Sequence, residues 1–330
     1  MDKILTIAIC AYNMEKYIYE ALSSCKIQDI DKIEVLVMND GSTDRTEEIV
    51  QQFCDQYPDS FRLITKPNGG WGSNINLAIQ LSSGTFFRIL DADDWFDSDN
   101  LEKFVKHLTQ TSADLVTSLY AHCCGNNKKV HRMEWEKYSG QELELCEIQE
   151  PIHLSMWGVT YRTAILKEHP LYLPEHSLYT DTLYVLKPLA FVRRISFYDR
   201  TVYNYRVGRS GQSVSVESIK KHYKEMQNVF YNQMIYYNEI GYKSVNKLHL
   251  QRRVEDTYHT LMENLLRLCC FHEIKVDELI RDADNMLKDT MPQLYDAFWN
   301  RKYIRLLRTA NYKNVKLVNK LLQVRNFVRN

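Results

Sequence analysis

Four short apolar runs, each followed by polar residues and then by a segment with helical spacing, dominate the first hundred residues. These runs are rich in branched and aromatic side chains and lie at Ile4–Cys10, Ile33–Met38, Phe61–Ile64 and Phe86–Leu90. Apolar positions three and four residues apart predict helices after them, at 17–22, 46–53, 75–81 and 99–109. Near-continuous apolar strands that alternate with helices predict a Rossmann-like α/β fold, with a mostly parallel sheet covered by helices on both faces.

The pattern changes beyond residue 110. A further strand is expected at Asp114–Tyr120, whereas residues 121–150 are polar and irregular. We expect variable and flexible structure there, with a turn at Asn126–Lys129. From about residue 216 glycine is nearly absent and helical spacing prevails. The chain is therefore expected to form an α/β domain at 1–215 and a helical C-terminal appendage at 216–330.

Crowded carboxylates mark the end of the fourth apolar run, as Asp91, Asp93 and Asp94. Like charges this close raise one another's pKa, and a divalent cation removes that conflict. Oxygen ligands without a His or Cys nearby favour Mg²⁺ or Mn²⁺, which usually bind one or two carboxylates together with substrate phosphates. Capping of the next helix explains Asp97 or Asp99 well. It does not explain acidic residues on the strand side, so Asp91 and Asp93 are the candidate metal-site residues.

Composition and charge alter this picture only slightly. With 330 residues, 45% hydrophobic and 25% charged, the chain can bury a sizeable core. It has no apolar run of about eighteen residues and no signal-peptide pattern, so a cytoplasmic protein is expected. The eight cysteines include no CxxC pair, which favours reduced thiols over disulfides or a zinc site.

The net charge of zero hides a basic end. Residues 301–330 contain nine Lys or Arg and no acidic residue, and their apolar positions have helical spacing. Such a helix suits an anionic membrane surface, the acidic remainder of the chain, or another subunit of a homo-oligomer. We expect no nucleic-acid partner.

The loops after the first, second and fourth strands should converge, because ligands bind beyond the carboxyl ends of parallel strands. Four segments in this region, in order and spacing, resemble the signature of family 2 glycosyltransferases with the GT-A fold; they are Ala8–Asn13, Asn39–Asp44, Asn68–Asn76 and Leu90–Asp94. A looser match continues over about 151–215. The chain departs from the family's pattern at Cys10, where proline is frequent, and at Asn39, where aspartate is frequent.

The resemblance implies an inverting, metal-dependent transfer of a sugar from a nucleotide sugar, UDP-linked in the first place, in bacterial surface-polysaccharide or glycoprotein glycan assembly. The acceptor would be a glycan, a glycoprotein or a lipid-linked sugar. The nucleotide-binding half would be 1–110 and the acceptor half 111–215. Two alternatives are a non-catalytic glycan-binding or scaffold protein and a nucleotidyltransferase, although the segment after the first strand lacks the glycine-rich basic loop that a triphosphate needs.

The same resemblance implies roles for single residues. Asp40 would accept a hydrogen bond from the uracil imide, Tyr12 would pack on the base, and Ala11 would leave room for it; turn chemistry also explains Asn39–Gly41. Asp93 would ligate Mn²⁺ or Mg²⁺ directly, with Asp91 near the ribose or the water shell of the metal. The remaining nucleotide-binding positions are Asn13, Gly70, Asn76 and Ala92.

Three further positions belong to the acceptor half. Asp181 is the candidate catalytic base, in a Thr-Asp pair where the family has Glu-Asp, and its alternative is a helix N-cap. Trp157 lines an acceptor pocket or simply packs. Arg206 and Arg209 belong to a glycine-flexed loop at 203–213 that either folds over a diphosphate or is a solvated surface loop.

Overall fold

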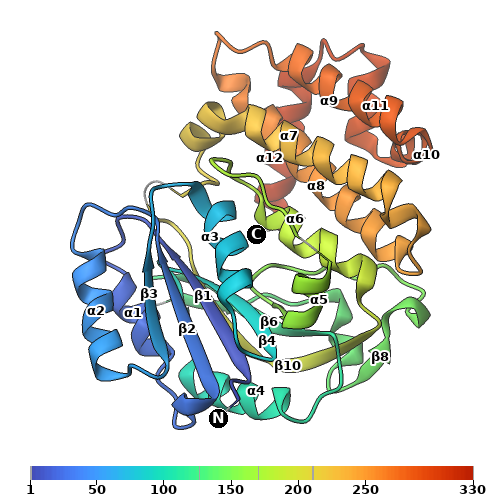
Figure 1. Cartoon of the computed structure of the whole chain (residues 1–330). Coiled ribbons are helices and arrows are strands. Elements are labelled where there is room, and N and C mark those ends of the chain that lie inside the picture. Colours follow the sequence, from blue (N-terminus) through green and yellow to red (C-terminus); the bar gives the residue numbers. More distant parts are fainter. Residues whose placement is uncertain (1, 126, 170, 210–211, 330) are drawn as a thin grey trace. The chain divides into compact units, whose positions relative to one another are not determined.

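The computed structural model describes residues 2–125, 127–169, 171–209 and 212–329, with side chains in the last helix described as far as Gln323. It divides into two compact units, Met1–Arg209 and Ser210–Asn330 (Figure 1). The boundary expected at 215/216 falls inside the second unit, where its first helix begins at Val216. Each unit is described by itself below.

One mixed sheet organises the first unit. Its strands are β1 (Leu5–Ala11), β2 (Ile33–Asn39), β3 (Phe61–Thr65), β4 (Phe86–Asp91), β5 (Trp95–Phe96), β6 (Leu115–Cys124), β7 (Asn127–Val130), β8 (Glu142–Glu144), β9 (Val159–Arg162) and β10 (Arg194–Arg206). The order is β3-β2-β1-β4-β9-β6-β10-β5, with β7 beside β6 and β8 beside β10. Strands β1 to β4 are parallel, as are β6 and β10, whereas β9 runs antiparallel between β4 and β6. The predicted α/β fold with a mostly parallel sheet is confirmed.

Helices of the first unit pack on these strands. They are α1 (Ile18–Ser24), α2 (Thr46–Gln56), α3 (Gly70–Leu81), α4 (Ser98–Leu108), α5 (Thr163–Glu168) and α6 (Asp181–Leu186). Helix α3 packs against β1 and β2, and α4 packs against β10. The central strand β1 has neighbours on both edges, and Leu5, Ile7 and Ile9 are fully buried. Burial of both faces explains why its sequence is continuously apolar rather than alternating.

Two expectations for this unit were wrong. The helix expected at 75–81 begins earlier, at Gly70, because the Asp40 side chain accepts hydrogen bonds from the Gly69 and Gly70 amides at its start. Residues 121–150 were expected to be irregular and flexible. They contain the end of β6, strands β7 and β8, and a 3₁₀ helix in which Trp135 is fully buried. Of the turn expected at Asn126–Lys129, residues 127–129 belong to β7 and Asn126 lies outside the described residues.

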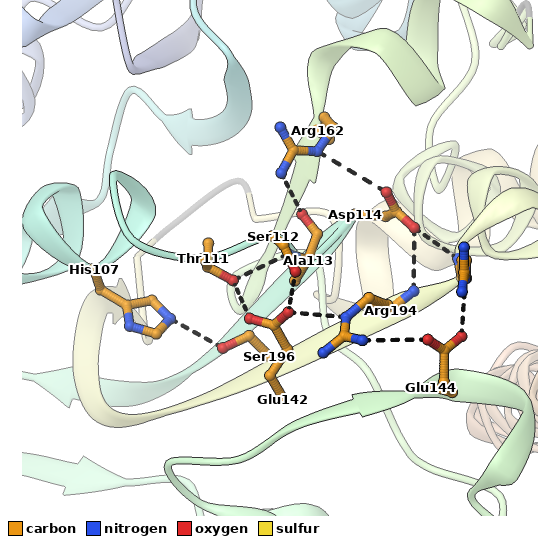
Figure 2. A network of polar contacts seen from close by, with 11 residues as sticks. His107, Thr111, Ser112, Ala113, Asp114, Glu142, Glu144, Arg162, Arg194 and Ser196 are labelled. Carbon is orange, nitrogen blue, oxygen red and sulfur yellow. Dashed lines mark hydrogen bonds and ion pairs between the residues drawn. The ribbon is translucent and has the colours of Figure 1, made fainter.

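A polar network explains why β8 is ordered despite its charged sequence. Figure 2 shows Arg194 at the start of β10 between Glu142 and Glu144 of β8, with Nε 2.9 Å from Glu142 Oε1 and Nη1 3.3 Å from Glu144 Oε1. Thr111 and Ser112 also donate hydrogen bonds to Glu142. These side chains satisfy one another's charges and hydrogen-bonding groups at the amino-terminal ends of β6 and β10. Ligands of such sheets bind at the opposite edge, beyond the carboxyl ends of the strands. We therefore interpret the network as structural.

The second unit is helical, with α7 (Val216–Glu239), α8 (Lys247–Arg267), α9 (Val276–Thr290), α10 (Pro292–Ala297), α11 (Lys302–Thr309) and α12 (Val315–Arg329). Among the residues described, no helix combines the length and apolarity that crossing a membrane requires. Four apolar side chains of the basic C-terminal segment are buried within the unit: Ile304, Leu307, Val315 and Val318. Most of its apolar face therefore packs against protein, while Leu306, Leu317 and Leu321 remain exposed. Contact with a membrane or another subunit stays a prediction.

Candidate active site

The register of the sheet brings three strand ends to one edge. Ala11 at the end of β1 lies beside Asn39 of β2, and Cys10 lies beside Asp91 of β4. The amide of Asp40 donates to the carbonyl of Ala11 at 2.9 Å. The residues predicted from three separate loops therefore meet at the carboxyl edge of the sheet.

Asp40 is buried, with 2% of its surface exposed, and it organises the next loop. Its Oδ1 accepts hydrogen bonds from Lys66 Nζ at 2.6 Å and from the Gly69 amide at 2.9 Å, and its Oδ2 accepts one from the Gly70 amide at 2.9 Å. A carboxylate at a helix N-terminus is favoured by the unpaired amides and by the helix dipole. A carboxylate offers about four acceptor positions, so one on Oδ2 is left for a ligand.

The loops beside Asp40 are held by side chains from neighbouring segments. Asn13 has a positive φ of 54°, and its Oδ1 accepts a hydrogen bond from the Thr43 amide at 2.8 Å. The side chain of Asn39 instead contacts α2, because its Nδ2 donates to Glu47 Oε2 at 2.7 Å. Between these turns Tyr12 is 49% exposed, while Ala11 beneath it is buried. Tyr12 therefore presents an open aromatic side chain directly after the end of β1.

The Gly69–Gly70 turn also docks the segment that leads to Asp181. The His176 amide donates to the Gly69 carbonyl at 2.7 Å. Gly70 has a φ of +79°, and a Cβ there would lie 3.2 Å from the His176 nitrogen. Asn76 Nδ2 donates to the Leu173 carbonyl at 2.9 Å, and Asn76 Oδ1 accepts a hydrogen bond from the Leu173 amide at 3.0 Å. Gly70 and Asn76, both predicted to bind the nucleotide, thus lie where the start of α3 contacts the segment that contains Leu173 and His176.

The acidic cluster sits at the end of β4. The indole Nε1 of Trp71 donates to Asp91 Oδ1 at 3.1 Å. Burial, together with the negative charges of Asp93 and Asp181, raises the pKa of Asp91 to about 7. Tyr184 of the helix that Asp181 begins lies edge-on to Trp71, with 6.4 Å between ring centres, so this helix reaches the side chain that donates to Asp91. Asp181 is the first residue of α6, and the N-cap position falls on Thr180 instead.

Asp94 and Ala92 have supporting positions. Ala92 is buried in the turn, and Asp94 is 1% exposed. Asp94 accepts hydrogen bonds from Tyr203 Oη and from the Arg206 amide, each at 2.7 Å. Burial and the charges of Asp91 and Asp93 raise the pKa of Asp94 well above its usual range. Asp94 therefore ties the acidic turn to β10.

The two arginines predicted to cover a diphosphate reach the same turn. Arg206 is the last residue of β10, so the part of the expected loop at 203–206 is a strand. Its Nε donates to the Asp93 carbonyl at 2.7 Å, and its guanidinium lies 4.6 Å from the centre of the Trp95 ring. Arg209 Nε contacts Asp93 Oδ2 at 2.7 Å. Both positive side chains thus lie beside the candidate metal ligand.

The donor set fits a divalent cation that shares its ligands with a substrate. Across the described part of the chain, no group of three or more His, Cys, Asp or Glu side chains is arranged to hold a metal ion. Asp91 and Asp93 are nevertheless hard oxygen donors, and burial, together with the charge of Asp93, raises the pKa of Asp91. Mg²⁺ and Mn²⁺ need only one or two carboxylates when phosphate oxygens complete the shell.

Several contributing residues were missed from the sequence. Lys66 and Trp71 flank the Asn68–Gly70 motif, and a lone basic and a lone indole side chain beside a glycine turn were the available signals. Tyr203, whose hydroxyl also accepts a hydrogen bond from the Asp91 amide at 3.1 Å, carried no local signal. Its role arises only from the pairing of β10 with the end of the sheet.

Comparison with known proteins agrees with this geometry. Residues 6–169 match the sequence profile of Glycosyl transferase family 2. EpsH of Bacillus subtilis, itself assigned as a glycosyltransferase, is 24% identical over 95% of this chain and 93% of its own. The poly(ribitol-phosphate) beta-N-acetylglucosaminyltransferase TarS of Staphylococcus aureus is 29% identical over 64% of this chain, an alignment that spans only 36% of TarS.

Solved structures show the same fold. A crystal structure of S. aureus TarS 1–349 in complex with UDP-GlcNAc superposes with a TM-score of 0.66 at 22% identity, over 97% of this chain and 91% of the other. A mannosyltransferase from Pyrobaculum calidifontis in complex with GDP-Man and Mn²⁺ has a TM-score of 0.53 at 17% identity, over 96% and 86% of the two chains.

Proposed function

Because the chain belongs to glycosyltransferase family 2 and has the GT-A fold, we propose that it transfers a sugar from a UDP-sugar to a hydroxyl group of a glycan, glycoprotein or lipid-linked acceptor. The observation that supports this best is the meeting of Asp40, the acidic turn and Asp181 at one edge of the sheet. TarS was crystallised with UDP-GlcNAc and with UDP, so UDP-GlcNAc is the first donor to test. The proposed setting is cytoplasmic assembly of surface polysaccharide.

The nucleotide would bind between Tyr12 and Asp40. The free acceptor position on Asp40 Oδ2 suits the imide N–H of uracil, and the exposed ring of Tyr12 suits packing on the base. Lys66 orients Asp40, since its ammonium group contacts Oδ1 at 2.6 Å. Asn13, Gly70, Asn76 and Ala92 would shape this pocket through the backbone contacts described above.

Asp93 and Asp91 would hold Mn²⁺ or Mg²⁺ beside the diphosphate. When bound there, the cation neutralises charge that develops on the departing diphosphate. Arg206 and Arg209 offer further positive charge, because guanidinium groups bind phosphate oxygens in a bidentate manner.

Asp181 would act as general base. Asp181 begins α6, whose Tyr184 packs edge-on to Trp71 beside Asp91, so the acceptor hydroxyl would bind next to the start of this helix. Removal of the hydroxyl proton as the oxygen attacks the anomeric carbon gives single displacement with inversion, through an oxocarbenium-like transition state.

The test is release of UDP from UDP-GlcNAc, UDP-glucose and UDP-galactose with Mn²⁺, with and without glycoside acceptors. Asp181→Asn is expected to lower turnover at least about 100-fold, as loss of a general base does. Asp199→Asn, a matched change of an exposed aspartate, should retain activity. Binding of a nucleotide sugar without turnover would instead favour a non-catalytic glycan-binding protein, and a product with retained anomeric configuration contradicts the single displacement.

A further inference from the structure

The last two helices of the second unit, α11 and α12 (Figure 1), expose a surface that is both basic and apolar. Its members, called the basic face below, are exposed cations and exposed leucines: Lys302, Arg305 and Leu306 on α11, and Lys316, Leu317, Lys320 and Leu321 on α12. Each of the three leucines is at least 42% exposed. The basic face therefore carries apolar surface that the rest of the chain does not cover.

Helical spacing and a shared hollow bring the members of the basic face together. On α12 the two lysines are four residues apart, as are the two leucines, so they form adjacent rows along the helix. Val315 and Val318 of the same helix are buried within the unit. Leu306 of α11 and Leu321 of α12 both line one open hollow. The exposed leucines of the two helices therefore belong to the same surface.

The charge of this surface is predominantly positive. Residues 301–330 contain nine Lys or Arg and no Asp or Glu. Three acidic side chains reach the hollow from α8, as Glu255, Asp256 and Glu263. Asp256 is paired within α8, where its Oδ1 lies 2.9 Å from Arg252 Nε. The segment that carries the basic face therefore adds positive charge only, and the acidic side chains beside it belong to another helix.

The composition of the basic face discriminates among the partners that cover such a surface. A two-fold dimer would place the basic face against itself, and like charges repel across an interface of this kind. Nucleic acid pairs with cations, but its single strands are held by aromatic stacking, whereas the exposed apolar members here are leucines. An anionic bilayer offers negative headgroups above a hydrocarbon layer, which match rows of lysine beside rows of leucine. The chemistry of the basic face therefore favours a membrane surface.

We propose that the basic face attaches the chain to the surface of a bilayer that contains anionic lipids. Its cations lie among the headgroup phosphates and its leucines at the boundary with the hydrocarbon, because long basic side chains reach outward while their stems stay beside apolar surface. The inference rests on the second unit alone, so it does not need the proposed function. Combined with that function, attachment keeps the chain at the surface where a lipid-linked acceptor lies.

Flotation of the full-length chain with lipid vesicles tests this attachment. One set of vesicles contains phosphatidylcholine alone, and the other also contains about 30% phosphatidylglycerol, which supplies the negative surface charge. The chain should float with the anionic vesicles and stay at the bottom of the gradient with the neutral ones. Binding should weaken at about 0.5 M NaCl, because salt screens the attraction between the cations and the headgroups.

Two double variants separate the electrostatic and the apolar contributions. Lys316→Gln with Lys320→Gln should weaken binding to anionic vesicles at least about 10-fold, since each basic residue near such a surface strengthens binding about 5-fold. Leu317→Gln with Leu321→Gln should also weaken it at least about 10-fold, because less apolar surface leaves water. Lys221→Gln with Lys224→Gln makes the same change of charge at exposed positions of α7 and should bind like the wild type. Wild-type melting temperatures establish that the variants are folded.

Several results would overturn the attachment. They are absence of binding to anionic vesicles, equal binding to neutral ones, and unchanged binding of both double variants. A dimer that the leucine variant loses, without binding to vesicles, would assign the basic face to a second copy of the chain. Tighter binding to an oligonucleotide than to vesicles would assign it to nucleic acid. Flotation uses no nucleotide sugar, so a failure of the proposed function leaves its result unaffected.

Discussion

Asp93 and Arg209 form an ion pair, with 2.7 Å between Oδ2 and Nε, that joins the turn after β4 to the last residue of the first unit. Both side chains are largely shielded from solvent, at 12% and 20% exposed. A proposed metal ligand is thus neutralised by a group that is also proposed to bind phosphate. A metal ion would have to compete with Arg209 for Asp93, and a phosphate group would have to compete with Asp93 for Arg209.

This competition predicts opposite effects of Arg209→Gln on two ligands. Without the Arg209 guanidinium, the Asp93 carboxylate no longer has this ion-pair partner and can bind a cation more readily. The affinity of the nucleotide-free chain for Mn²⁺ should therefore rise about 3-fold to 10-fold, which corresponds to roughly 1 kcal/mol. The affinity for UDP should fall by a similar factor, since roughly 1 kcal/mol of charge-assisted hydrogen bonding is lost. Calorimetric titration with each ligand measures both. Parallel changes of the two affinities would argue against the shared role, and Arg193→Gln, at an exposed arginine distant in the sheet, is the control.

Asp40→Asn is expected to affect folding as well as binding. The change removes the ion pair with Lys66 and replaces one of the two acceptor oxygens by an NH2 donor, which faces the N–H donors of Lys66, Gly69 and Gly70 at the start of α3. We expect a loss of about 1–3 kcal/mol in unfolding free energy and weaker UDP binding. Urea denaturation measures the first effect, and Asp199→Asn should leave it unchanged. A variant with native stability and native UDP affinity would contradict both roles.

His259 predicts how the second unit responds to acid. Burial, with the charge of Arg301, lowers the pKa of His259 to about 4, and its Nδ1 lies 2.6 Å from Tyr303 Oη. The unfolded chain binds a proton near the ordinary histidine pKa of about 6.5, whereas the folded chain does not. Stability from this residue is therefore present above pH 6.5 and is lost as the pH falls toward 4. Thermal unfolding of wild type and His259→Gln over this range should show a shallower pH dependence in the variant, and identical profiles would exclude the effect.

A buried ion pair centres the helical unit and makes a strong stability prediction. Asp284 is fully buried and accepts hydrogen bonds from Arg308 Nε at 2.7 Å and Tyr312 Oη at 2.6 Å, and also from Tyr258 Oη. Asp284→Ala leaves Arg308 as a buried charge without its carboxylate, which costs about 3–5 kcal/mol.

The Asp284→Ala variant should lose its helical signal at a lower temperature than the wild type, and this difference measures the cost in stability. Glu278→Gln breaks the exposed pair with Lys275 and should change stability by less than about 0.5 kcal/mol. Similar melting curves for the two variants would show that the buried network contributes little.

The strands and the crowded carboxylates after β4 were predictable because their signals are local. Ile4–Cys10 reads as a buried strand from its own residues, and β1 occupies Leu5–Ala11. The crowding of Asp91, Asp93 and Asp94 is visible in four consecutive positions. The carboxyl ends of parallel strands share one edge of a sheet, so the meeting of the loops there could also be expected from the sequence.

Other features depend on contacts between segments far apart in sequence. The start of α3 at Gly70 depends on Asp40, thirty residues earlier, and the order of β8 depends on Arg194, about fifty residues later. The stacking of Trp157 on Tyr205 likewise depends on the position of β10 and on Arg88, which donates a hydrogen bond to the Trp157 carbonyl. The periodicity of a segment indicates which of its own side chains are buried. Capping, ion pairing and ring stacking depend on a residue from another segment, which only the folded chain brings into contact. The sequence by itself determined the sheet and its acidic edge, and the tertiary structure decided which side chains complete the site around it.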